Sequence, residues 1–161
     1  MSRILITFFS MSGHTRRLAE EIRSATGADI EEIIEQRPRH GAWGMLRALW
    51  DASLRRKSGV LAAKHNPADY DLLVLGGPIW ARHLASPVRT FADQYGSRAK
   101  RVGFFCTEGK EGAETAFTDL EKLCQHKPVA TLAVDAQHLA PESHRSDLGR
   151  FVACLRREAT A

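Results

Sequence analysis

The chain has 161 residues, of which 43% are hydrophobic, and a net charge of +4, so it has material for one globular core and not for two. Its longest apolar runs fall far below the ~18 residues of a membrane-spanning helix, which excludes an integral membrane protein. The three cysteines are far apart and form no CxxC pair, which excludes a disulfide framework and a cysteine metal site and favours a cytoplasmic protein with reduced thiols.

Five short apolar segments alternate with amphipathic helical patterns along the chain. Parallel strands are buried on both faces and need a crossover helix between them, so this alternation is typical of a parallel sheet. The sequence predicts a three-layer α/β fold, a doubly wound five-stranded parallel sheet with helices on both faces, as one domain over residues 1–161. The predicted strands are 4–9, 30–34, 72–76, 101–106 and 129–134.

The helical patterns have recognisable ends. The first predicted helix covers about 15–26 and stops at Gly27, which can adopt the left-handed conformation of a C-cap. Ser86 and Pro87 suit the N-cap and the first position of the next helix. Two more helices follow, one at about 113–125 and one whose inward face lies within 148–155.

Residues 40–59 interrupt this alternation, because they lie between the second and third strands where one crossover helix would suffice. They carry an apolar stripe and a group of basic residues. We expect a helical insertion that either packs onto the sheet or forms part of a substrate mouth, a docking surface or a homodimer contact. The stripe is Trp43, Met45, Leu46, Leu49 and Trp50, and the basic residues are Arg47, Arg55, Arg56 and Lys57.

The turn SMSGHT, residues 10–15, separates the first strand from the first helix. In open α/β sheets, ligands bind at the carboxyl ends of the strands. Three hydroxyls, one glycine and the free N–H groups of a helix N-terminus can together hold a phosphate. The spacing has neither the lysine of a Walker loop nor the G-x-G-x-x-G of dinucleotide-binding folds. The alternative is that the turn only caps the helix.

Three stretches carry a family resemblance. S-x-S-G-x-T after the first strand resembles the phosphate loop of flavodoxins and related FMN proteins. GGPIWA, after the third strand, is similar to the loop that covers one flavin face with an aromatic, and FFCTEG is similar to the loop at the pyrimidine end. The resemblance covers nearly the whole chain except 40–59. It implies noncovalent FMN and the flavodoxin-like strand order 2-1-3-4-5.

The resemblance also implies which residues bind the cofactor, with Trp80 as the residue that stacks on the flavin. The third loop lacks the aromatic that family members often have there, which suggests an open second face. His14 either adds to anion binding or faces solvent, and Cys106 is interpreted as a buried apolar residue rather than a redox thiol. No catalytic residue and no metal ligand is assigned. The cofactor-binding set is Ser10, Met11, Ser12, Gly13, His14, Thr15, Pro78, Ile79, Trp80, Ala81, Cys106, Thr107, Glu108, Gly109 and Gly112.

Two classes of function stay open. The first is an FMN redox protein, either an electron carrier for a partner protein or an oxidoreductase that passes electrons from NAD(P)H to a quinone or similar small acceptor. The net charge of +4 departs from the strongly acidic surface of flavodoxin carriers. The second is a flavodoxin-like binding module without flavin. Nucleic acid is not an expected partner, because the basic residues belong to no known reading motif.

Overall fold

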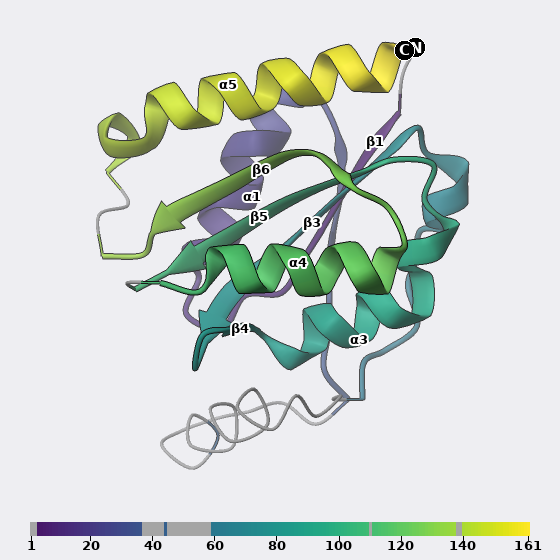
Figure 1. Ribbon diagram of the computed structural model, residues 1–161, viewed down its shortest axis with the longest axis horizontal. Helices are drawn as coiled ribbons and strands as arrows, with labels where there is room; N and C mark the ends of the chain where they lie inside the picture. Colours follow the sequence, from purple (N-terminus) through teal and green to yellow (C-terminus); the bar gives the residue numbers. More distant parts are fainter. Residues whose placement is uncertain (1–2, 37–43, 45–58, 110, 138–139) are drawn as a thin grey trace.

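The computed structural model describes residues 3–36, 44, 59–109, 111–137 and 140–161 (Figure 1). In these ranges, parallel strands form a sheet in the order β2-β1-β3-β5-β6, and a short β4 pairs antiparallel with β3. This confirms the predicted order 2-1-3-4-5, with one short strand added. The strands are β1 (Ile4–Phe8), β2 (Asp29–Glu32), β3 (Leu72–Trp80), β4 (His83–Leu84), β5 (Val102–Glu108) and β6 (Pro128–Asp135).

Helices cover both faces of the sheet. Figure 1 shows α1 and α5 on one face and α3 and α4 on the other, which confirms the predicted three layers. None of the described helices combines the length and the apolar character that a bilayer span needs. The helices are α1 (His14–Thr26), α3 (Ser86–Tyr95), α4 (Ala113–Cys124) and α5 (Pro141–Thr160), with short 3₁₀ turns at Pro67–Asp69 and Gly96–Arg98.

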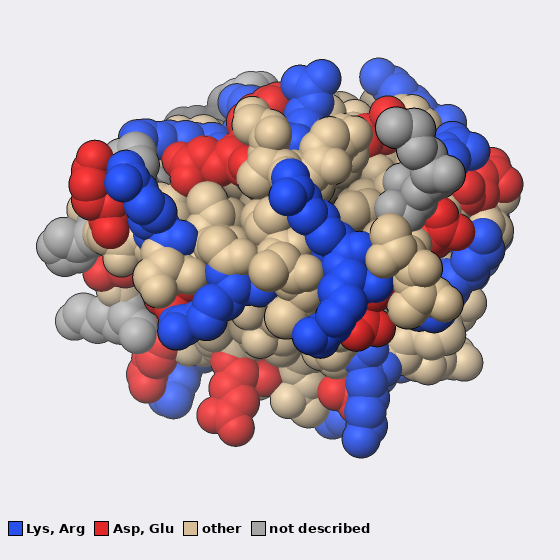
Figure 2. Space-filling view, turned by 90° about the horizontal axis from the view of Figure 1, so that it is seen from above, with Lys and Arg blue, Asp and Glu red and all other residues tan. Residues whose placement is uncertain are grey.

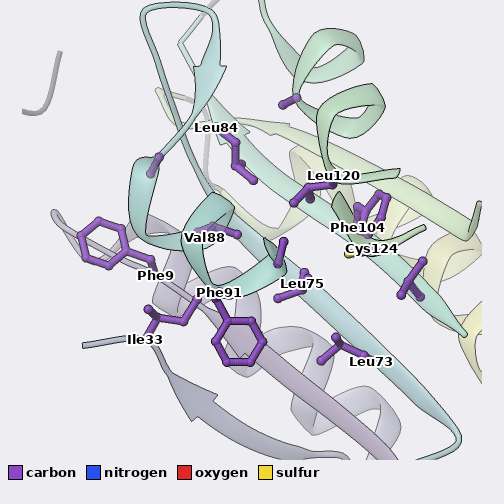
Figure 3. Packing of buried hydrophobic residues seen from close by; sticks show 14 of the residues in the cluster. Phe9, Ile33, Leu73, Leu75, Leu84, Val88, Phe91, Phe104, Leu120 and Cys124 are labelled. Carbon is purple, nitrogen blue, oxygen red and sulfur yellow. The ribbon is translucent and has the colours of Figure 1, made fainter. Parts of the chain in front are cut away.

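Each face of the sheet has its own hydrophobic core, because successive residues of a strand point to opposite faces. In β1, Ile4 and Ile6 pack with α1 and α5, whereas Leu5 belongs to the core under α3 and α4. Figure 3 shows this second core, where Phe91 of α3 and Leu120 of α4 lie over the sheet. The two cores hold the carboxyl ends of the central strands in fixed positions.

The C-terminal end of α1 is where the sequence predicts it, whereas the N-terminal end of α3 lies one residue earlier than predicted. Gly27 ends α1 in the left-handed conformation, with φ of 70°, and its N–H donates to Arg23, as predicted. The predicted N-cap Ser86 is instead the first residue of α3, and Ala85 is the N-cap. Ala85 follows the β4 turn directly and its N–H donates to Pro78 O at 3.0 Å, so the chain enters the helix one residue earlier.

The third strand is longer than predicted. Residues 77–80, expected in a loop, continue β3 and then turn back into β4. The two residues of this turn, Ala81 and Arg82, have φ of 46° and 66°. Positive φ at both central residues is the pattern of a type I′ turn, which usually has Asn-Gly there. The sequence carries no such signal, so the hairpin was not predictable from it.

The predicted insertion at 40–59, with its apolar stripe and basic residues, lies outside the described residues apart from Gly44 and Gly59. The structure describes the chain up to residue 36 and again from residue 59. Glu35 and Val60 form an antiparallel bridge, and Leu61 N donates to Ile34 O at 2.8 Å. The described residues before and after this segment therefore lie side by side, close to the end of β2.

Candidate cofactor site

The predicted site residues lie at the carboxyl ends of β1, β3 and β5, which are adjacent strands. Backbone pairing aligns these ends. Phe9 N donates to Gly76 O at 3.1 Å, and Pro78 is the partner of Thr107 between β3 and β5. The structure thus brings the three stretches together at one edge of the sheet, where open α/β folds bind ligands.

Ser10 organises the turn before α1. Its Oγ accepts hydrogen bonds from Gly13 N at 3.1 Å and from Arg16 N at 3.2 Å. Gly13 has φ of 93°, which a glycine adopts without strain, and α1 begins at the next residue. Ser10 therefore caps the start of α1, which is the alternative role predicted for this turn. Its own hydroxyl proton stays available for a ligand.

The first turn of α1 has unused donors. Within the described part of the chain, the N–H groups of His14 and Thr15 donate to no acceptor. Ser12 and His14 are exposed, and a Cβ on Gly13 would meet no heavy atom within 4 Å. N–H and O–H donors at a helix N-terminus, with open space beside them, form an anion-binding arrangement.

The arginines that follow the turn are paired elsewhere. Arg16 contacts Glu32 at 2.6 Å on the exposed surface, and Arg17 lies 3.5 Å from Glu21. An anion in the turn would thus be held mainly by neutral donors and the helix dipole. This agrees with the absence of lysine and arginine from residues 10–15.

The hydroxyl groups of Thr15 and Thr107 form a direct hydrogen bond, with 2.8 Å between the two Oγ1 atoms. Both residues are buried, with 1% and 3% of their surface exposed. The resemblance implies that Thr107 lines the flavin ring, and that contact stays a prediction; its hydroxyl contacts the polar turn. The bond joins the end of β5 to the first turn of α1 across 92 residues of sequence.

Trp80 is the last residue of β3 and is packed into the core, with 7% of its surface exposed. Its ring meets the ring of Phe9 edge to face, with 5.6 Å between the centroids and 88° between the planes. This geometry is a favourable aromatic arrangement. The predicted stacking residue therefore lies at the site but is more buried than a residue on an open loop would be. Its contact with the flavin stays a prediction.

The hairpin turn and the loop after β5 pack against each other. A Cβ on Gly112, which has φ of 127°, would lie 2.7 Å from Ile79 Cγ2 and 3.0 Å from Arg82 Cα. Arg82 also pairs with Glu111 at 3.3 Å on the surface. Sequence reasoning missed Arg82, because no residue pattern indicates which turn faces this loop. A side chain at Gly112 would therefore be disfavoured twice, by the positive φ of the backbone and by its contact with the hairpin turn.

Glu108 is a structural residue in this arrangement. Its Oε2 accepts from Ala113 N at 3.0 Å, at the start of α4, and its carbonyl accepts from Ala136 N at 2.8 Å. The carboxylate thereby links the end of β5 to the first residue of α4, and the positive end of the α4 dipole favours it there. Gly109 in this loop has open space around it.

Cys106 is fully buried within β5. Burial raises the pKa of its thiol, and the charge of Glu108 raises it further. Burial also raises the pKa of the Cys124 thiol to about 12, while Cys154 is partly exposed. Cys106 thus packs as an apolar residue and presents no thiolate to a ligand.

We expect this difference to appear in thiol labelling at pH 8. Because a raised pKa keeps a thiol protonated at this pH, only Cys154 should react quickly with a thiol-specific reagent in the native protein. The other two should react after denaturation. Counting the released chromophore before and after adding guanidinium measures this, and a second fast thiol in the native protein would contradict it.

The comparisons with known proteins agree on one family. A family model described as flavodoxin matches residues 3–152. The chain is similar to a flavoprotein in complex with FMN from Lactobacillus acidophilus NCFM, at 20% identity, with a TM-score of 0.71 over 92% of this chain and 99% of that one. It is similar to oxidised flavodoxin 2 from Bacillus cereus, at 19% identity and a TM-score of 0.61 over 98% and 99% of the two chains. A flavodoxin of Streptococcus pneumonia TIGR4 matches at 14% identity and a TM-score of 0.64, again over 98% and 99%. At these identities, the likeness to solved structures shows the fold.

Proposed function

The chain belongs to the flavodoxin family, and from this premise we propose that it is a redox protein that binds FMN at the carboxyl ends of β1, β3 and β5. The observation that carries the proposal is the donor set of the turn at residues 10–15, which suits a phosphate dianion. The similar flavoprotein from Lactobacillus acidophilus binds FMN on the same fold. When bound, FMN supplies reversible electron transfer.

The residues of this chain bind and orient the cofactor in this proposal. The hydroxyls of Ser10, Ser12 and Thr15 and the N–H groups of the first turn of α1 hold the phosphate, and Ser10 also fixes the shape of that turn. Ile79 and Trp80 flank one side of the ring. Thr107, Glu108 and Gly109 lie at the pyrimidine end, where Glu108 is fixed by its bond to Ala113 N and Gly112 packs against the β3–β4 turn.

We propose NAD(P)H as electron donor and a quinone or similar small molecule as acceptor. The support is the loop after β5, which has no aromatic residue to cover the second flavin face. The surface charge supports it too. Figure 2 shows basic and acidic side chains intermixed on the face seen from above, where α5 lies. Arg23 with Glu20 on α1 and Arg145 with Glu142 on α5 are local pairs of exposed side chains. An acidic docking face typical of an electron carrier is not seen on it.

The first test is an absorption spectrum of the purified protein, followed by titration of the apoprotein with FMN. Oxidised flavin bands or stoichiometric uptake are expected. Steady-state oxidation of NADPH or NADH with a quinone then separates the reductase from the carrier. A colourless protein that takes up no FMN would favour the binding module without flavin, and FMN uptake without turnover would favour the carrier. The three free cysteines suit a reducing, cytoplasmic location.

Ser10→Ala and Ser12→Ala should separate the two roles of the turn, capping α1 and binding the phosphate. Ser10→Ala removes the acceptor for Gly13 N and Arg16 N, so the free energy of unfolding of the apoprotein should fall by about 1 kcal/mol. Ser12 is exposed, so Ser12→Ala should change that free energy by less than about 0.5 kcal/mol.

Both variants should raise the FMN dissociation constant, by about tenfold, because each removes a hydrogen bond to a charged group. Urea denaturation of the apoprotein and flavin fluorescence titration measure the two quantities. Equal stability of the two apoprotein variants would show that Ser10 is not the residue that shapes the turn.

A further inference from the structure

We infer that Thr107 is a positioning residue for the phosphate site, acting through the hydroxyl of Thr15 rather than through the flavin ring. The inference rests on the proposed function and deepens it. The observation is the buried hydrogen bond between the two Oγ1 atoms, 2.8 Å long.

Neither hydroxyl is free to turn to bulk water. Thr107 is in β5 between Pro78 of β3 and Val134 of β6, so its backbone is fixed by the sheet. Thr15 is the second residue of α1 and 1% exposed. Each side chain is β-branched, and its rotamer is restricted by its own backbone. The pair thus forms one rigid unit between the strand end and the helix start.

The direction of this hydrogen bond is open in the absence of an anion, because either oxygen can donate its proton. A phosphate oxygen only accepts. When an anion occupies the turn, the Thr15 hydroxyl donates its proton to the anion, because the anion cannot donate one in return. The Thr15 oxygen can then accept a hydrogen bond from the Thr107 hydroxyl. Thr107 therefore selects the orientation in which Thr15 donates to the phosphate, and the two bonds in series strengthen each other.

This arrangement makes a prediction that depends on the phosphate alone. Riboflavin has the same ring and ribityl chain as FMN but no phosphate, so the two ligands separate a phosphate effect from a general effect on the site. Thr107→Val keeps the shape and the β-branch of the side chain and removes the donor. Thr107→Ser restores a hydroxyl.

The experiment is a fluorescence titration of the apoproteins with FMN and with riboflavin. Thr107→Val should raise the FMN dissociation constant about tenfold, as expected for weakening one hydrogen bond to a charged group. The riboflavin constant should change by less than about twofold, and Thr107→Ser should lie near the wild type for both ligands. In a Thr15→Val background, Thr107→Val should add little further loss, because the two residues act as a unit.

Equal losses for FMN and riboflavin, or no loss for either, would overturn the inference and leave FMN binding itself intact. A wild-type protein that binds neither flavin would overturn the proposed function, and the inference with it, before any variant is made. Circular dichroism checks the fold of each variant. If Thr107→Val does not fold, Thr107→Ala is titrated in the same way, and the same ratio of FMN to riboflavin affinity decides.

Discussion

Gly76→Ala should lower the free energy of unfolding by about 3 kcal/mol, although it adds only one methyl group. A Cβ on Gly76 would lie 2.2–2.4 Å from three ring carbons of Phe105, its direct partner in the neighbouring strand. Phe105 is fully buried in the core under α1 and α5, so its ring has no free space to enter. The strands would have to separate, or the ring leave its rotamer, at the centre of the sheet.

Gly149→Ala is the matched control. Gly149 is exposed in α5, and a Cβ there would meet no heavy atom within 4 Å. Alanine is the better helix former, so this variant should gain about 0.5–1 kcal/mol. Urea denaturation followed by circular dichroism should show shifts of opposite sign for the two variants. Unchanged stability of Gly76→Ala would show that Phe105 can move aside, and the close packing of β3 on β5 would then not limit this position.

The overall fold was predictable because it depends on local patterns. The apolar runs at 4–9, 72–76 and 101–106 overlap β1, β3 and β5, and parallel strands with helices between them leave few arrangements. The end of α1 at Gly27 was also predictable from local sequence, because glycine readily adopts the positive φ of a helix C-cap. These features need no knowledge of which distant residues meet.

The place where the three stretches of the candidate site meet was predictable from the sequence, and the contacts between their side chains were not. The three stretches lie together as expected, because the carboxyl ends of adjacent parallel strands share one edge. The bond between Thr15 and Thr107 and the edge-to-face contact of Trp80 with Phe9 depend on side chains brought together by the finished sheet. The β4 hairpin was not predicted, because its type I′ turn contains Ala81 and Arg82, whereas such turns usually contain Asn and Gly.

Trp80→Ala should have two separate effects, and the burial of Trp80 is the reason. The indole fills part of the core beside Phe9, so its removal should lower the free energy of unfolding of the apoprotein by about 3–4 kcal/mol. If the ring also stacks on the flavin, the FMN dissociation constant should rise more than about tenfold and flavin fluorescence should be less quenched. A loss of FMN affinity alone would therefore not identify the stacking residue.

Trp80→Phe and Phe9→Leu separate the two effects. Trp80→Phe keeps an aromatic ring in the core and should retain most of the apoprotein stability, while quenching of the bound flavin should weaken because the indole is gone. Phe9→Leu disturbs the same packing contact and keeps the indole, so it should lower the free energy of unfolding by about 1 kcal/mol and leave the quenching unchanged. Both quantities come from urea denaturation and from the fluorescence of flavin at saturation. If Trp80→Phe leaves the quenching unaltered, Trp80 is a core residue that supports the site from behind, and another side chain covers the flavin face.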